Sequence, residues 1–339
     1  MTDVNVVIAP LQLVYPPFSN YQAILLEDDD ATVERLRRSD LYMIGARAQA
    51  LFDLTAHESV GSDDAPVHRF GISAGGIQGT FDLDFNALLA LHDIELAEGN
   101  VVIFEGDETF LGFWVGKPTD ADGEQLEPFE WFTPEKLIYD RGLGRPGISG
   151  LDNYRDFATF ELLYVGMAAD SDTFERLITG SHAARQKILG AEFPRRVGAR
   201  VSDEIVFFAF DIVHFRMRTM TESLGFLPSD ADTVKAHDRA VTADAEKAFI
   251  KLLDPAYNKV KYQQYPRGAD GLFAEGLSSY GYFLNQNLTF VTDTGELYGS
   301  TNPVWSNDSC AQLPDSGADV IGVRGTDVAV FKGQQHADE

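Results

Sequence analysis

The segment Leu162–Leu189, LLYVGMAADSDTFERLITGSHAARQKIL, decides how the rest of the chain is interpreted. It begins with a β-rich run that ends in Tyr164-Val165-Gly166, and it continues with residues of helical spacing. The helical part carries a set of polar and basic side chains, Arg176, His182, Arg185 and Lys187. This order predicts a strand followed by helices that present these side chains near the end of the strand.

Length and composition limit the class of protein and the number of domains. The chain has 339 residues, of which 44% are hydrophobic and 24% are charged, as in globular proteins of one large or two ordinary domains. The single cysteine, Cys310, excludes an intramolecular disulfide and any multi-cysteine metal site. We find no signal-peptide pattern and no apolar run long enough to cross a bilayer. We therefore expect a soluble, cytoplasmic protein without a membrane partner. The sequence does not indicate an oligomeric state.

The charge is distributed unevenly along the chain. The net charge is −26, and residues 1–150 contribute −17 whereas residues 151–265 contribute only −2. Residues 176–200 hold six cations and one acid, Glu192. Phosphate binding requires local Lys and Arg, so this basic segment is a candidate nucleic-acid surface despite the acidic total. A solvated helix face explains the same pattern. The residues that we expect to contact the nucleic-acid backbone are Arg185, Lys187, Arg195, Arg196 and Arg200.

A second helical run carries an acid in an apolar pattern. Positions 246, 249, 250 and 253 follow helical i, i+3, i+4, i+7 spacing, and three of them are Phe, Ile and Leu. Glu246 occupies the first of these positions, where a carboxylate is costly unless it is paired or binds a metal. One carboxylate completed by phosphate oxygens and water is ordinary Mg²⁺ coordination. Glu246 is therefore a candidate ligand of Mg²⁺ or Mn²⁺, with a salt bridge to an arginine as the alternative.

The order of these features resembles the GIY-YIG nuclease superfamily over roughly residues 151–262. Tyr164-Val165-Gly166 is similar to the YIG half of the family signature, and Phe174-Glu175-Arg176 is similar to the segment with the catalytic arginine. His182 lies where several members have a histidine. Glu246 is similar to the metal-binding glutamate. Asn258 is similar to the asparagine that closes the core motif, and we expect it to contact the nucleic acid.

The chain lacks a Gly-Ile-Tyr sequence, so the first tyrosine of the family signature has to be assigned by spacing. The family places it about ten residues before the second tyrosine, which points to Tyr154, with Tyr139 as another candidate. With Tyr154, the predicted catalytic set comprises Tyr154, Tyr164, Arg176, His182 and Glu246.

The resemblance implies an α+β fold, with a small antiparallel sheet flanked by helices as its core. It divides the chain into a β-rich N-terminal domain (1–148), a nuclease domain (149–265) and a C-terminal β-rich extension (266–339). The implied activity is divalent-metal-dependent hydrolysis of DNA phosphodiester bonds, for instance in restriction or genome defence. One alternative is a catalytically degenerate nucleic-acid-binding or regulatory protein. Another is an unrelated α+β enzyme with its site in residues 1–150.

Local patterns predict several further elements. Residues 4–14 read as a strand at a sheet edge, because Pro10 interrupts it. Residues 31–49 have helical spacing. Asn100–Gly116 reads as a hairpin, Thr133-Pro134 starts a helix, and the Gly-rich run 141–150 is a connector rather than a phosphate-binding loop.

Overall fold

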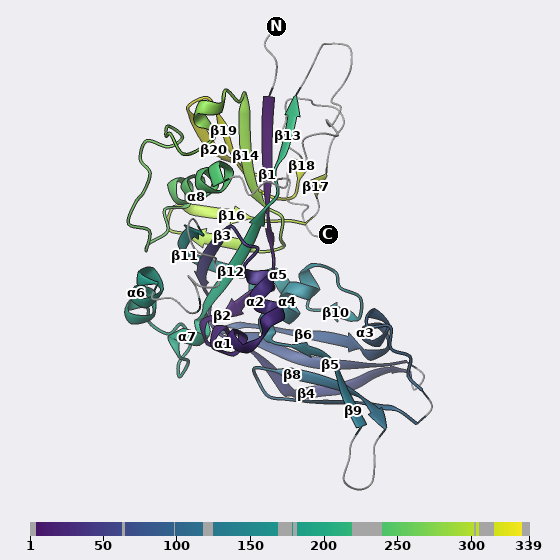
Figure 1. Cartoon of the computed structure of the whole chain (residues 1–339). Coiled ribbons are helices and arrows are strands. Elements are labelled where there is room, and N and C mark those ends of the chain that lie inside the picture. Colours follow the sequence, from purple (N-terminus) through teal and green to yellow (C-terminus); the bar gives the residue numbers. More distant parts are fainter. Residues whose placement is uncertain are drawn as a thin grey trace. The chain divides into compact units, whose positions relative to one another are not determined.

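The computed structural model of the chain describes residues 5–62, 65–97, 99–117, 125–168, 178, 182–218, 239–301, 303–304 and 315–333. They form two compact units (Figure 1). Unit 1 comprises Met1–Arg47, Thr159–Pro194 and Arg200–Glu339, and unit 2 comprises Ala48–Ala158 with Arg195–Ala199. Unit 2 is therefore an insertion in the sequence of unit 1, and these units differ from the three predicted ranges.

Unit 1 is built on a large mixed sheet rather than the predicted small antiparallel one. Its hydrogen-bonded path runs β16-β15-β11-β3-β12-β1-β14-β19-β20, and the β1–β14 and β11–β15 pairs are parallel. The strands are β1 (Asn5–Leu13), β3 (Leu41–Ala46), β11 (Thr159–Met167), β12 (Ile205–Ile212), β14 (Ser279–Leu284), β15 (Thr289–Thr292), β16 (Gly295–Tyr298), β19 (Val320–Arg324) and β20 (Asp327–Phe331).

The predicted fold class is therefore wrong. The N-terminal strands β1 and β3 and the C-terminal strands β14 to β20 belong to the same sheet as β11 and β12, so they form neither a separate domain nor an extension. The antiparallel set β11-β3-β12 is only one part of this sheet. The reason is long-range pairing: β3 lies between two strands from the middle of the chain, and local sequence carries no signal for such partners.

The predicted helix over residues 31–49 is replaced by a helix and a strand. Helix α2 (Asp30–Leu36) begins at Asp29, whose side chain accepts from the N–H groups of Ala31 and Thr32, and β3 follows it. All six residues of β3 are buried. A strand covered on both faces reads as a continuous apolar run without alternation, and such a run is easily taken for a buried helix.

Strand β1 is internal to the sheet, although Pro10 predicts an edge. Leu11 pairs with Ile212 of β12 and Ile8 with Phe215 of β13 (Phe215–Arg218), so Pro10 faces Val213 in the gap between these two strands. Proline has no N–H to donate, and the ladder is interrupted at this position. The interruption lets an internal strand carry a proline.

The helices of unit 1 cover the sheet and its ends. They are α1 (Asn20–Leu25), α2, α6 (Ala183–Ala191), α7 (Val201–Glu204) and α8 (Arg239–Leu253), with the short strand β2 (Phe18–Ser19) beside β12. Helix α8 contacts β11 and β16 (Figure 1). The core between the first helices and the sheet includes Ala23, Leu36, Tyr42, Ile44, Leu163, Ile188, Ile205 and Phe207.

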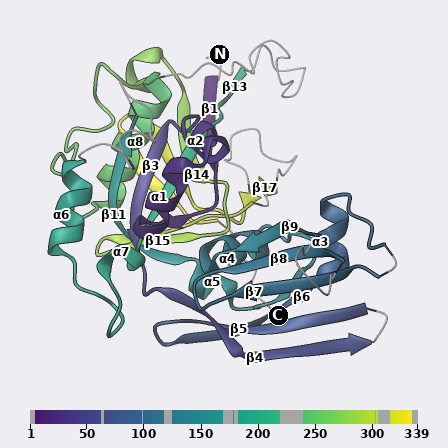
Figure 2. The same cartoon turned by 60° about the horizontal axis from the view of Figure 1, so that its bottom comes forward.

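Unit 2 contains two antiparallel sheets of its own (Figure 2). One has the order β10-β6-β5-β4 and the other β7-β8-β9. Aromatic contacts such as Phe70–Phe104 and His57–Phe104 link the two sheets. The elements are β4 (Ala50–Ser62), β5 (Ala65–Ala74), β6 (Ile77–Asp84), α3 (Phe85–Leu91), β7 (Val101–Gly106), β8 (Leu111–Lys117), β9 (Gln125–Phe132), α4 (Pro134–Gly142), β10 (Ile148–Gly150) and α5 (Tyr154–Phe157).

Two local predictions in this unit are confirmed. Strands β7 and β8 form the predicted hairpin, with Val101 paired to Gly116 and Gly106 to Leu111. Helix α4 starts as predicted, with Thr133 as its cap and Pro134 in its first turn. Both elements are specified by adjacent residues, so a sequence pattern is sufficient to find them.

Candidate functional site

The candidate site begins with two tyrosines on neighbouring strands. Strands β3 and β11 run antiparallel, and Tyr42 pairs with Gly166. The rings of Tyr42 and Tyr164 stack with centroids 6.0 Å apart and planes inclined by 27°. A Cβ atom at Gly166 would lie 2.6 Å from the Tyr42 ring and hydroxyl, and 2.7 Å from the Tyr164 ring. The glycine of the Tyr-Val-Gly sequence therefore makes room for the pair of tyrosines.

Tyr42 is the tyrosine that sequence reasoning missed. The two predicted candidates lie in unit 2: Tyr154 on α5, where its ring contacts Arg141 and Arg155, and Tyr139 on α4. Burial, with a smaller effect of Asp140, raises the pKa of Tyr139 to about 12. Spacing along the chain pointed to these residues because the insertion of unit 2 between β3 and β11 is invisible in the sequence.

His182 lies beside both tyrosines. Its ring is 5.2 Å from that of Tyr164 and 5.7 Å from that of Tyr42, edge-on in both cases. It caps helix α6, and its Nδ1 accepts a hydrogen bond from the N–H of Arg185 at 3.1 Å. A neutral imidazole that accepts at Nδ1 carries its proton on Nε2. Nε2 lies 2.8 Å from the Tyr42 hydroxyl, so His182 donates and the Tyr42 oxygen accepts.

This tautomer determines what His182 can do chemically. Both ring nitrogens are engaged, one as the helix cap and one as a donor to Tyr42. A histidine in this state holds a phenol in place by donating a hydrogen bond from its Nε2–H to the phenol oxygen. The geometry favours a positioning role for His182 over that of a general base.

Tyr262 connects Tyr164 with Glu246. Glu246 is half-buried on α8, and the Tyr262 hydroxyl hydrogen-bonds to its carboxylate. Burial raises the pKa of the Tyr262 phenol to about 12, and the charges of Glu246 and Asp270 and the nearby Tyr164 add to the rise. The backbone of Tyr262 has a φ of 41°, in the left-handed region that non-glycine residues rarely adopt. A strained backbone conformation fixes this phenol against the carboxylate.

Asn258 holds the strand that carries Tyr164. Its Oδ1 accepts from the N–H of Val165 at 2.9 Å, and its Nδ2 donates to the carbonyl of Val165 at 2.7 Å. The N–H of Tyr257 donates to Leu163 at 3.0 Å. These contacts replace a neighbouring strand along this stretch of β11. Asn258, predicted to contact nucleic acid, is buried and acts on the backbone of the protein itself.

A buried acid that sequence reasoning missed anchors α8. Asp244 is 1% exposed and accepts hydrogen bonds from the hydroxyls of Tyr265 at 2.6 Å and Tyr282 at 2.9 Å, and from the N–H of Leu272 at 2.8 Å. Burial raises the pKa of Asp244, although these hydrogen bonds and Lys247 act in the opposite direction. Because all of its contacts are within the fold, Asp244 fixes α8 relative to β14 and the segment 262–272.

Three residues of the predicted basic segment make contacts within unit 1. Arg185 donates to Asn20 Oδ1 at 2.7 Å and to the carbonyl of Ile178 at 3.0 Å, and its guanidinium lies over Phe207. Arg200 pairs with Asp203 at 3.0 Å. Lys187 lies over the ring of Tyr257. Arg195 and Arg196 group with unit 2, and Arg176 lies outside the described residues.

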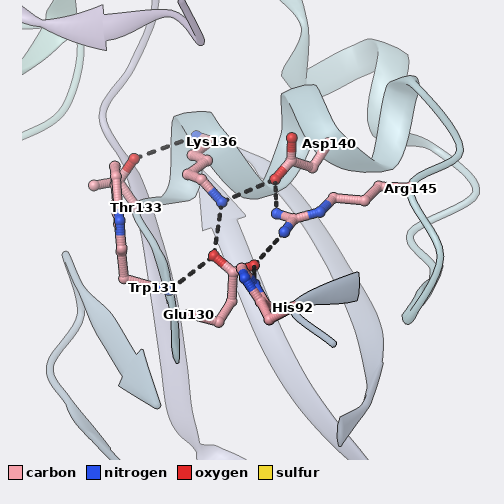
Figure 3. A network of polar contacts seen from close by, with 7 residues as sticks. All are labelled: His92, Glu130, Trp131, Thr133, Lys136, Asp140 and Arg145. Carbon is pink, nitrogen blue, oxygen red and sulfur yellow. Dashed lines mark hydrogen bonds and ion pairs between the residues drawn. The ribbon is translucent and has the colours of Figure 1, made fainter. Parts of the chain in front are cut away.

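Unit 2 holds a separate cluster of charges that is closed on itself (Figure 3). Glu130 of β9 pairs with Lys136 Nζ at 3.1 Å and with Arg145, and Asp140 pairs with the same two cations at 3.0 Å and 2.6 Å. His92 lies 3.3 Å from Glu130. The two acids and two strong bases neutralise one another, which is typical of a structural network rather than an active site in residues 1–150.

The donor set near Glu246 limits the metal that could bind there. The described part of the chain contains no group of three or more His, Cys, Asp or Glu residues that could hold a metal ion. Mg²⁺ is commonly bound by one or two carboxylates together with substrate phosphates and water. Glu246, with Tyr262 to orient it, is compatible with such a substrate-completed site and not with an all-protein metal centre.

None of the family models, curated proteins and solved structures compared with the chain matches it. Within the described residues, no helix combines the length and apolar character needed to span a membrane.

Proposed function

We propose that the chain is a divalent-metal-dependent endonuclease that hydrolyses DNA phosphodiester bonds, with a site related to that of the GIY-YIG nucleases. The observation that carries this proposal is the cluster Tyr42, Tyr164, His182, Tyr262 and Glu246, which five separate segments of unit 1 contribute. Restriction or genome defence is the process in which we place such an activity.

The tyrosines act as neutral hydrogen-bonding groups in this proposal. Each phenol carries one O–H donor and an oxygen that also accepts. The Tyr42 oxygen accepts from His182, so the hydrogen of its own O–H is directed away from that ring. Tyr42 is fully buried, so its role is to position the Tyr164 ring that stacks on it. Tyr164 is partly exposed and can orient an attacking water or a phosphate oxygen, which lowers the entropic part of the barrier.

Glu246 would hold the Mg²⁺ or Mn²⁺ ion. When bound, the ion would neutralise charge on the phosphate and activate water. Tyr262 keeps the carboxylate in one orientation by donating a hydrogen bond to it. Arg176, the arginine that the family resemblance assigns to the phosphate, lies outside the described residues.

The test is cleavage of plasmid, linear and single-stranded DNA, and of RNA, by the purified protein with Mg²⁺ or Mn²⁺. We expect Glu246→Gln to lower the cleavage rate by about a hundredfold or more at unchanged folding, as loss of a metal ligand or its orientation does. Asp327→Asn, at an exposed position on β20, is the matched control and should cleave like the wild type. A wild-type protein that leaves every substrate intact refutes the proposal.

A nucleic-acid-binding or regulatory protein without catalysis is the second candidate. It is favoured by the commitment of Arg185 to Asn20 and Ile178, which leaves fewer cations for a substrate. Binding of DNA without cleavage, unchanged in Glu246→Gln, is the result that would select it.

A further inference from the structure

Lys247 follows Glu246 on α8 and is unusually enclosed for a lysine. Its side chain is only 11% exposed. Its ammonium group lies 5.9 Å from the centre of the Tyr262 ring, and it forms an ion pair with Asp270. Asp270 itself is 72% exposed. An enclosed cation is therefore neutralised by a carboxylate that reaches it from the solvent side.

This pairing differs from the other ion pairs of α8 and its surroundings. Asp244 is also near Lys247, but it accepts three hydrogen bonds from Tyr265, Tyr282 and the N–H of Leu272. Asp270 receives its main stabilisation from Lys247, which holds the pKa of this carboxyl below its usual range. Asp270 is thus the partner of Lys247 that can leave without disrupting the core.

We propose that Lys247 binds a phosphate of the nucleic acid and that Asp270 occupies this position until the substrate displaces it. The inference rests on the proposed function, because it places the phosphate next to Glu246. Lys247 and Glu246 are adjacent in sequence, and both contact Tyr262, one at its ring and the other at its hydroxyl. A lysine is a suitable phosphate ligand since it is a compact point charge.

The displacement of Asp270 by a phosphate explains why an acidic protein can bind a polyanion at Lys247. An exposed carboxylate gains little from its ion pair, because solvent screens it and two side chains must be held in place. A phosphate oxygen bound to the same ammonium adds the interactions made by the rest of the substrate. Removing Asp270 should therefore favour the phosphate, whereas removing Lys247 should remove one phosphate contact.

The experiment measures binding in Ca²⁺ by fluorescence anisotropy of a short fluorescein-labelled DNA duplex, over a series of salt concentrations. We expect Asp270→Asn to bind the duplex about fivefold more tightly than the wild type. Lys247→Met should bind the duplex more weakly. Its salt slope, the slope of log affinity against log salt concentration, should be smaller in magnitude by about 1, and Lys247→Arg should restore the slope. Lys251→Met is the control on the same helix, where Lys251 contacts Gln263, and it should leave the salt slope unchanged.

A parallel measurement follows the thermal stabilisation of each variant by inorganic phosphate. Stabilisation that grows in Asp270→Asn and disappears in Lys247→Met supports the site even if the wild type binds no DNA, in which case the nuclease proposal alone fails. Unchanged DNA affinity in Asp270→Asn, together with an unchanged salt slope and unchanged phosphate stabilisation in Lys247→Met, overturns the inference.

Discussion

Replacing Glu130 by Gln should destabilise unit 2 severely. The Glu130 side chain is 4% exposed, and its carboxylate pairs with Lys136 and Arg145, whose side chains are 14% and 22% exposed. Removing one partner of a buried charge network typically costs about 3–5 kcal/mol, because the remaining charges lose their compensation. Asp140 still contacts both cations, so we expect the lower end, about 3 kcal/mol. For a unit of this size that corresponds to a fall in Tm of about 12 °C.

Differential scanning calorimetry of the whole chain measures this change. The control is Glu127→Gln, an exposed acid on the same strand, which should alter the free energy of unfolding by less than about 0.5 kcal/mol. Glu130→Gln combined with Asp140→Asn should lose more than the sum of the two single changes, because in each single variant the remaining acid still compensates both cations. A Glu130→Gln protein as stable as the control would show that the network does not contribute to stability.

The same network gives a pH dependence with a defined sign. Burial alone would raise the pKa of Glu130, but Lys136, the N–H of Trp131 and Arg145 outweigh it and hold the pKa below its usual value. A lowered folded-state pKa stabilises the fold above the unfolded-state pKa of about 4.5, and this contribution is lost as the pH falls through the folded-state value. The acid limb of the Tm–pH curve should therefore be flatter in Glu130→Gln than in the wild type.

Three further predictions concern unit 1 and the whole chain. Gly166→Ala should lower the free energy of unfolding, measured by chemical denaturation, by about 2 kcal/mol because the added Cβ would overlap Tyr42. Gly190→Ala is the control: its Cβ would meet no atom within 4 Å, so it should be neutral or stabilising. Equal effects of the two changes would contradict the packing around Gly166. Asp244→Ala should lower the free energy of unfolding by about 2–4 kcal/mol because Tyr265 and Tyr282 lose the acceptor of their hydroxyl groups. A loss below about 0.5 kcal/mol would show that Asp244 does not anchor α8. The Tm should rise between about 0.1 M and about 1 M NaCl, because salt screens the self-repulsion of a net charge of −26; a falling Tm would be inconsistent with this.

Local sequence was sufficient to predict structure where the residues that form the pattern belong to a single helix or strand. The apolar positions Phe249, Ile250 and Leu253 are buried on α8, as the helical spacing predicts, and Glu246 beside them is half-buried. The costly position of this acid was therefore readable from the pattern alone. Its partner was not, because Tyr262 lies in an irregular segment after the helix, and its left-handed backbone has no sequence signature in a tyrosine.

Pairings across the chain could not be predicted. Tyr42 stands in a fully buried strand whose neighbours, β11 and β12, are encoded far downstream. The basic residues of the segment 176–200 looked like one surface because they are close in sequence. Arg185 instead packs inward against Asn20 and Phe207, since a guanidinium can satisfy its donors inside the fold as readily as on a phosphate.

The insertion of unit 2 between β3 and β11 has a consequence for how the chain folds. Ala46 and Glu161 are paired neighbours, yet the intervening stretch comprises roughly 110 residues. Closing an unstructured loop of that length costs about 3.5 kcal/mol more conformational entropy than a two-residue turn. If unit 2 collapses first, its compact form brings the two strand ends together and avoids most of this cost. During synthesis, Tyr42 can meet Tyr164 only after residues 48–158 of unit 2 have been made, so this unit has the first opportunity to fold.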